Sequence, residues 1–406
     1  MTVSRRKLLK FATGAAALTG VPGVLKADQG PIVIGEINSY IDELDYYTSS
    51  YRRGVLLAVE EVNQQGGVRN REFKVSIQND YGKADEAVKL AYQLVNEEKV
   101  AMLCGSFLSD ISLAISTAAK GLEIPFLAGG ALTDRLTLDD GNEYTFRMRP
   151  STYMQSHMLA KEAARLPVNK WLCIAPDYEF GYSAVENFKT LLSKSRPDIE
   201  WQGDVYVPLF NADVTALSQR LQSGNYDAVF NATFSADLAK VIEAAQGVER
   251  FKEVSVVSML SGEPEYLREL KSRICQGWIV TGYPWEDIGL PSHQRFVATY
   301  QSRFDESPTM ASLNGYLTIK AAARALQVAD DLSSAAILKS LNHLYLDSPF
   351  GVVRMRALDH QSSFGTFVGR LEYKDGKNRM KHWYYADGSE HWPARKVVER
   401  RRPPSA

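Results

Sequence analysis

Short apolar runs alternate with stretches of helical periodicity along most of this 406-residue chain, and the alternation occurs in two series. The first series begins with the β-branched run at residues 32–37, continues with helical spacing over 51–65 and extends to about residue 127. The second series begins at Trp171 and extends to residue 258. Strands that alternate with helices form a parallel sheet with helices on both faces. We therefore expect an α/β fold with two doubly wound parallel-sheet lobes.

The length and the end of the chain fit this organisation. A chain of this length is too long for one compact core, and the usual domain size of roughly 150 residues favours two domains. Strand-like residues at 278–281 and helical spacing over 294–304 and 311–329 provide further elements for both lobes. Residues 394–406 are charged and contain two prolines, so we expect a disordered basic tail there, which could also attract an acidic surface.

Residues 1–27 have the zones of an export signal. Ser4, Arg5 and Arg6 precede a short apolar run that contains Pro22, which is the pattern of a twin-arginine signal peptide. The run is shorter than the roughly 20 apolar residues that a membrane-spanning helix needs. We expect cleavage after Ala27 and a periplasmic mature protein. The alternative is the basic, disordered N-terminus of a cytoplasmic protein.

Composition argues against several classes of site. The net charge is −1 and no basic cluster lies outside the tail, so nucleic acid is a poor candidate partner. Cys104, Cys173 and Cys275 have no paired short spacing, which disfavours a zinc or iron–sulfur site and allows at most one disulfide. Cys104 and Cys173 lie in apolar strand-like runs, where we expect buried free thiols.

Enzyme motifs are missing from the sequence. It has no glycine-rich dinucleotide fingerprint after the first strand, no phosphate-binding Gly-Lys-Ser/Thr loop and no Gly-x-Ser-x-Gly turn. The six histidines are scattered without metal-ligand spacing. We therefore expect a protein that is not an enzyme and that binds no cofactor or metal.

Three loops of the first series are candidates for ligand binding, because ligands of open α/β sheets bind at the carboxyl ends of the strands. Residues 105–109 lead into a helix, so the Ser109 hydroxyl and free N–H groups suit a carboxylate or carbonyl oxygen, unless Ser109 only caps the helix. Residues 129–133 let the main chain approach a ligand, or form a simple turn. Tyr46 and Tyr47 either close over an apolar group or lie on the surface beside the helix.

Several short motifs follow one another along the chain in a characteristic order. They are Ile34-Gly35, Gly66-Gly67-Val68, Asn79-Asp80, Gly105-x-x-x-Ser109, Ile124-Pro125-Phe126, Asp177-x-x-Phe180-Gly181, Gly277-Trp278 and Ser348-Pro349-Phe350-Gly351. In this order and spacing the chain resembles the Leu/Ile/Val-binding protein family. These are the type I periplasmic solute receptors of ABC transporters for branched-chain amino acids, amides, urea and aromatic acids.

The resemblance implies a ligand site at the loops named above. A ligand carboxylate would be held by Ser109 and by the main chain of the second loop, at Gly130 and at Leu132 or Thr133. Aromatic walls would come from Tyr46 and Phe180.

One departure from the family concerns the ammonium group of an amino acid. The family's amino-acid receptors hold it with a tyrosine and a glutamate of the second lobe, and the matching positions here are Phe234 and Leu260. Glu263 or Asp237 could substitute, because both lie a few residues away. A carboxylate or amide without an ammonium group fits the apolar residues better.

The resemblance also implies three crossings between the lobes, near Pro150, Tyr283 and Ser348, and closure of the lobes around the ligand. Tyr283 and Trp285 would line the mouth of the cleft or pack at the hinge. With these crossings lobe I takes residues 28–149 and 284–347, and lobe II takes residues 150–283 and 348–393.

The expected protein is a monomeric substrate-binding component of an ABC transporter. It would capture a small polar solute, such as an amino acid, an amide or a small aromatic or aliphatic carboxylate, and deliver it to a membrane permease. A ligand sensor of the same fold, acting on a signalling partner, is the alternative. An exported hydrolase or redox enzyme would need a catalytic constellation that the sequence lacks.

Overall fold

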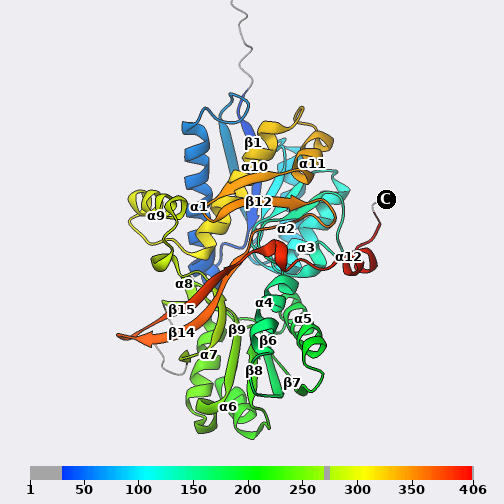
Figure 1. Cartoon of the computed structure of the whole chain (residues 1–406). Coiled ribbons are helices and arrows are strands. Elements are labelled where there is room, and N and C mark those ends of the chain that lie inside the picture. The colour runs from blue at the N-terminus through cyan, green and yellow to red at the C-terminus, as the bar shows by residue number, and fades with distance from the viewer. Residues whose placement is uncertain (1–29, 269–274, 405–406) are drawn as a thin grey trace, which may run out of the picture. The chain divides into compact units, whose positions relative to one another are not determined.

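Two β-sheets, each with its own helices, organise the residues that the computed structural model describes, 30–268 and 275–404 (Figure 1). From Pro31 onward the chain forms one compact unit. Both sheets are mixed and mainly parallel, so the predicted α/β fold with two lobes is confirmed. The predicted signal peptide, residues 1–27, lies outside the described residues.

The sheet of lobe I is parallel except at one edge, where β12 runs antiparallel to both β11 and β13. In the order in which they lie side by side, its strands are β11 (Tyr345–Ser348), β12 (Gly351–Arg356), β13 (Gln361–Ser362), β5 (Thr145–Arg147), β4 (Phe126–Ala128), β3 (Leu103–Gly105), β1 (Ile32–Asn38) and β2 (Phe73–Asn79). The central strands are short apolar runs buried on both faces, as expected of a covered parallel sheet.

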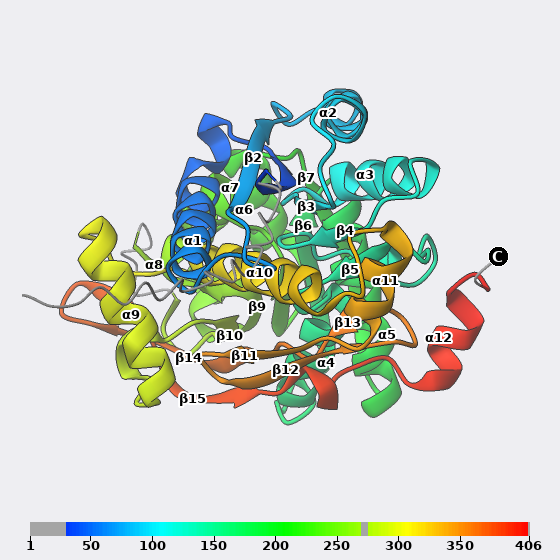
Figure 2. The same cartoon turned by 90° about the horizontal axis from the view of Figure 1, so that it is seen from above.

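Helices cover both faces of this sheet. They are α1 (Asp45–Gln64), α2 (Ala84–Asn96), α3 (Ser109–Gly121), α9 (Pro291–Phe304), α10 (Met310–Val328) and α11 (Ser334–Asn342). Figure 2 shows α2 and α3 on one side of the strands and α1 and α10 on the other. Helices α1 and α10 approach closely because glycines meet there. A Cβ at Gly54 would lie 1.9 Å from the main-chain oxygen of Ser312, and one at Gly315 would lie 2.2 Å from the main-chain oxygen of Tyr51.

The sheet of lobe II has the same design, with an antiparallel hairpin at one edge. Its strands, in spatial order, are β15 (Lys377–Ala386), β14 (Thr366–Lys374), β10 (Ile279–Gly282), β9 (Ser255–Gly262), β8 (Ala228–Asn231), β6 (Lys170–Pro176) and β7 (Glu200–Val207). Its helices are α4 (Thr152–Ala163), α5 (Glu179–Ser195), α6 (Val214–Ser223), α7 (Ser235–Gln246) and the short α8 (Pro264–Leu267).

The sheet order determines where the chain passes between the lobes. It passes first between β5 and α4, the segment that contains Pro150, and then between β10 and α9, the segment that contains Tyr283. The third crossing was predicted near Ser348, and this prediction is wrong. Strands β12 and β13 still belong to the sheet of lobe I, so the chain crosses between β13 and β14. Residues 348–362 are therefore part of lobe I.

The tail also differs from the prediction. Instead of being disordered beyond residue 393, the chain forms helix α12 (Arg395–Arg401). Arg401 donates a hydrogen bond of 2.7 Å to Asp134 and contacts Asp139, and Arg402 donates to the main-chain oxygens of Thr137 and Asn142. The basic residues thus bind an acidic loop of this same chain. None of the helices in the described ranges has the length and apolar character that crossing a bilayer requires.

Candidate functional site

The first two candidate loops meet at the carboxyl ends of β3 and β4. Ser109 begins α3, and its side chain is 1% exposed. The Ser109 hydroxyl accepts a hydrogen bond of 3.2 Å from the N–H of Thr133 in the loop that follows β4. The structure therefore brings the predicted serine and the predicted main-chain donor together, and the two form a hydrogen bond.

A small interlobe cavity lies beside Ser109. Its lining residues come from both lobes and are Phe107, Ser109, Leu132, Tyr178, Phe180, Phe234 and Leu260. Five of them were predicted as ligand-binding residues: Ser109, Leu132, Phe180, Phe234 and Leu260. Phe107 and Tyr178 were missed, although each lies within two residues of a predicted position, in a loop that follows β3 or β6.

Aromatic rings form most of the cavity wall. The Phe234 ring lies edge-on to Phe107 and Phe180, with centroid distances of 5.8 Å to both, and the Tyr178 ring is 6.3 Å away. Edge-to-face contacts at these distances are favourable for aromatic pairs. The cavity thus combines the buried Ser109 hydroxyl with a largely aromatic enclosure, in which Tyr178 is the other lining residue that carries a hydroxyl.

Tyr47, Gly130 and Thr133, which were also predicted to bind ligand, lie beside the cavity rather than on its wall. Tyr47 packs behind Phe107 with a centroid distance of 4.1 Å, and its hydroxyl lies 3.4 Å from Arg149. The N–H of Gly130 donates to the Ser106 oxygen at 3.2 Å. A Cβ at Gly130 would lie 2.9 Å from that same oxygen, so the close approach of the two loops requires glycine.

Thr133 and its neighbours join the two lobes next to the cavity. The Thr133 hydroxyl donates to Glu179 of α5 at 2.7 Å, and Arg135 donates to the other Glu179 oxygen at 2.7 Å. Asp134 accepts from the Ser183 hydroxyl at 2.6 Å. These contacts connect the loop that follows β4 in lobe I to the first turns of α5 in lobe II.

The two lobe II carboxylates that could have held an ammonium group both have partners within the chain. Glu263 and Arg149 form an ion pair of 2.6 Å, and both side chains are 2% exposed. Asp237 accepts hydrogen bonds from the N–H groups of Phe210 at 2.6 Å and Ala212 at 2.9 Å. Neither carboxylate lines the cavity.

Burial governs the ionisation of these groups. It raises the pKa of Glu263, and the Arg149 guanidinium beside this carboxylate opposes the rise and stabilises the charged form. Burial likewise raises the pKa of Asp237, although the two main-chain N–H groups stabilise its charged form. Burial alone would lower the pKa of Arg149, but Glu263 and the neighbouring tyrosines raise it.

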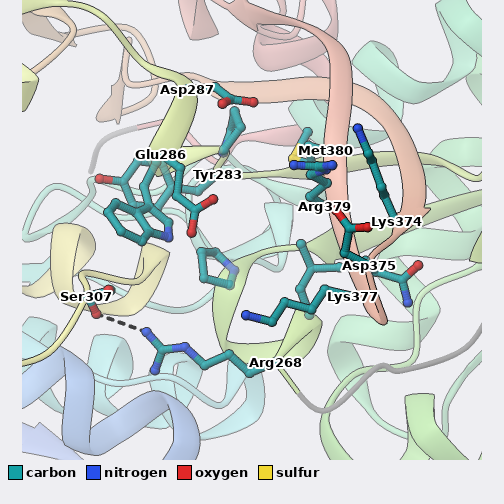
Figure 3. A pocket seen from close by; sticks show the side chains of 15 residues that line it. Arg268, Tyr283, Glu286, Asp287, Ser307, Lys374, Asp375, Lys377, Arg379 and Met380 are labelled. Carbon is teal, nitrogen blue, oxygen red and sulfur yellow. Dashed lines mark hydrogen bonds between the residues drawn. The ribbon is translucent and has the colours of Figure 1, made fainter.

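Tyr283 lies in a different place from the cavity. Its hydroxyl is 2.6 Å from Nε2 of His293, and its ring packs against Phe350 and Phe367. It also borders an open hollow beside the second crossing. Figure 3 shows Glu286 and Asp287 on one side of this hollow and Arg268 and Lys377 across from them. Tyr283 therefore packs at the hinge, away from Ser109.

The described residues contain neither a cluster that could hold a metal ion nor a disulfide. Within residues 30–268 and 275–404 no three His, Cys, Asp or Glu side chains are grouped so that they could hold a metal ion. Cys104, Cys173 and Cys275 are buried and free, and burial raises the pKa of each thiol.

Comparison with known proteins agrees with this architecture. Residues 32–377 match the model of a family described as periplasmic binding protein. The Leu/Ile/Val-binding protein homolog 7 of Brucella abortus is 24% identical over 387 residues, which cover 90% of this chain and 94% of that protein.

Two solved structures share the fold with a TM-score of 0.78 and 18% identity each. One is a solute binding protein of an ABC transporter from Rhodopseudomonas palustris in complex with 3,4-dihydroxybenzoic acid, matched over 88% of this chain and 98% of that one. The other is a leucine-, isoleucine-, valine-, threonine- and alanine-binding protein from Brucella ovis, matched over 90% and 97%. The match of the family model over most of the sequence confirms the resemblance: this chain belongs to the periplasmic binding protein family.

Proposed function

We propose that this protein is the periplasmic substrate-binding component of an ABC transporter and that its ligand is a small carboxylate with an apolar, preferably aromatic, body and no α-ammonium group. Family membership and the printed functions of its relatives support the transport role. The observation that carries the ligand class is the pairing of Glu263 with Arg149 and of Asp237 with main-chain N–H groups.

The apolar wall makes an ammonium group unfavourable. An ammonium beside Leu132, Phe234 and Leu260 would lose its hydration without gaining a counter-ion, and an unpaired buried charge costs several kcal/mol or more. Of the two solved relatives, one binds an aromatic acid and the other binds amino acids. The apolar wall favours a ligand of the first kind.

The other end of the cavity suits a carboxylate. Ser109 is the first residue of α3, where free N–H groups and the helix dipole favour negative charge. The Ser109 hydroxyl would turn to donate to the ligand, and the Thr133 N–H that it now accepts from would donate as well. Closure of the lobes then encloses the ligand, because only the closed form contacts it from both sides. This role is binding and release without chemical turnover.

A thermal-shift screen tests the ligand class. We expect benzoate, phenylacetate or aliphatic carboxylates to raise the melting temperature in proportion to the logarithm of their concentration, because a ligand that binds only the folded state stabilises it by about 2.7 kcal/mol at a hundred times its Kd. Amino acids, amides and urea serve as comparisons. Stabilisation by an amino acid alone would contradict the proposal.

The transport role needs a separate test. We expect the liganded protein to stimulate the ATPase of its cognate permease reconstituted in vesicles, and we expect the purified protein to leave the ligand chemically unchanged. A stable ligand-dependent complex with a receptor kinase would instead support a sensor, and turnover of the ligand would indicate an enzyme.

A further inference from the structure

Three buried polar atoms at the lobe interface have no hydrogen-bond partner within the described residues. They are the hydroxyl oxygens of Tyr46 and Tyr266 and the Oε2 atom of Glu263. The rings of Tyr46, from α1 in lobe I, and Tyr266, from α8 in lobe II, lie 5.4 Å apart. Leaving a polar group buried and unpaired costs about 1–3 kcal/mol, so three such atoms in one place indicate that another molecule supplies the missing bonds.

These atoms lie close to the interlobe cavity. Glu263 donates its N–H to the Leu260 oxygen at 2.8 Å, and Leu260 lines the cavity. The Ser235 hydroxyl donates a hydrogen bond of 3.2 Å to the main-chain oxygen of Glu43, three residues before Tyr46, so Ser235 of lobe II lies beside the start of α1. Ser235 directly follows the cavity residue Phe234.

The backbone around the cluster is strained. Leu260 has a φ of 70° and Ser235 a φ of 56°, in the left-handed region that glycine prefers. Non-glycine residues in this region cost of the order of 1–3 kcal/mol, and they concentrate at ligand sites. Both strained residues stand where the cavity wall meets the unpaired polar atoms.

The chemistry of the cluster selects one kind of ligand group. Arg149 holds Oε1 of Glu263 at 2.6 Å, which fixes the carboxylate and leaves Oε2 free to accept one hydrogen bond. Because Arg149 already neutralises Glu263, a neutral donor fits better than a second cation. A hydroxyl fits all three atoms, since it donates to Oε2 and accepts from a tyrosine hydroxyl.

We propose that Tyr46, Tyr266 and Glu263 form a polar subsite of the interlobe site, which binds a hydroxyl group on the ligand at the end away from its carboxylate. This inference rests on the proposed function and narrows it to hydroxylated carboxylates, hydroxyaromatic acids above all. Ser109 binds the acid group at one end, and the polar subsite binds the hydroxyl at the other.

Calorimetry with matched pairs tests the subsite. The probes are benzoate with 4-hydroxybenzoate, and phenylacetate with 4-hydroxyphenylacetate, which differ within each pair only in the hydroxyl. In the unmodified protein we expect the hydroxylated member of at least one pair to bind at least about tenfold more tightly, as for a hydrogen bond to a charged group. In the variants Tyr266→Phe and Tyr46→Phe we expect this preference for the hydroxylated acid to fall several-fold, while the Kd of the unhydroxylated acid changes little.

Tyr300→Phe is the matched control, because it also removes a buried, unpaired hydroxyl but lies on α9. It should keep the full hydroxyl preference. Equal binding within both pairs, or a preference that survives in both tyrosine variants, would overturn the subsite while leaving the proposed function intact. If no member of either pair binds and an amino acid does, the proposed function fails instead.

Discussion

Arg149, just after the last residue of β5, and Glu263, at the start of α8, lie 2.6 Å apart and join the first crossing to lobe II through a buried ion pair. Arg149 also donates to the Gly130 oxygen at 3.3 Å and lies over the Tyr47 ring at 5.4 Å. One guanidinium therefore contacts the loop that follows β4, the aromatic layer behind the cavity and the second lobe.

Breaking this pair should destabilise the fold. Arg149→Met leaves the Glu263 carboxylate buried without a counter-ion, so we expect a loss of about 3–5 kcal/mol in the free energy of unfolding, measured by urea titration. The double variant Arg149→Met with Glu263→Leu should lose less, because no unpaired charge remains. Arg303→Ala is the control. It breaks an exposed pair with Glu60 and should cost less than about 1 kcal/mol. Equal losses in both single variants would contradict this account of the pair.

Removal of the Ser109 hydroxyl should weaken ligand binding. A charge-assisted hydrogen bond contributes about 1.5–3 kcal/mol, so Ser109→Ala should raise the Kd for a carboxylate roughly 10- to 150-fold in calorimetry. Ser112→Ala is the control. Ser112 is buried in the same helix, but its hydroxyl does not line the cavity. An unchanged Kd in Ser109→Ala would refute the carboxylate site.

The C-terminal helix should contribute to stability through Arg401. Its guanidinium contacts Asp134 and Asp139, and Asp134 is 3% exposed, so Arg401→Ala leaves a nearly buried carboxylate with the Ser183 hydroxyl as its remaining side-chain partner among those described. We expect a loss of about 1–3 kcal/mol in the free energy of unfolding. The exposed neighbour Arg400, changed to Ala, should stay within about 0.5 kcal/mol of the unmodified protein. Loss of the same amount in both variants would show that the contact with Asp134 is not the cause.

The buried Glu36 should make the free energy of unfolding depend on pH. It is fully buried in β1, burial raises its pKa from 4.5 to about 8, and the Tyr40 hydroxyl that donates to it at 2.9 Å only partly opposes this shift. Between these two pH values the unfolded chain ionises Glu36 and the folded chain does not. The contribution of Glu36 to stability therefore falls as pH rises, by up to about 1.4 kcal/mol per unit, and is constant above about pH 8.

The variant Glu36→Gln isolates this effect, because glutamine keeps the shape of the protonated acid and does not titrate. We expect its stability relative to the unmodified protein to increase from pH 5 to pH 8, measured by urea titration at each pH. Parallel stability curves for the two proteins would contradict a protonated Glu36.

The two lobes could be predicted from the sequence because each strand–helix unit is a local pattern. The third crossing could not, since β12 and β13 are short and follow a turn at Ser348 that looks like the end of a lobe. Which sheet they join depends on pairing with β5, more than 200 residues earlier in the chain. The prediction of a disordered tail failed for the same reason, because Arg401 contacts Asp134 and Asp139 only in the folded protein.

The candidate site was also predictable only in part. Ser109 and Leu132 were predicted because ligand loops follow the strands of an open sheet, and Phe180, Phe234 and Leu260 were predicted from the family resemblance. All five line the cavity, and their contact with a ligand stays a prediction. The sequence could not reveal that Arg149 takes Glu263, because the partners are 114 residues apart and belong to different lobes. Tyr283 was named for its place at a crossing, but its contact with His293 sets its position at the hinge.

The central claim is that the interlobe cavity takes a carboxylate without an ammonium group. Calorimetry with 4-methylpentanoate against leucine, and with 3-phenylpropanoate against phenylalanine, tests it most directly, because the members of each pair differ only in that group. We predict that in at least one pair the acid without the ammonium binds at least about tenfold more tightly, a difference of about 1.4 kcal/mol. Tighter binding of leucine or phenylalanine than of its partner would contradict the account.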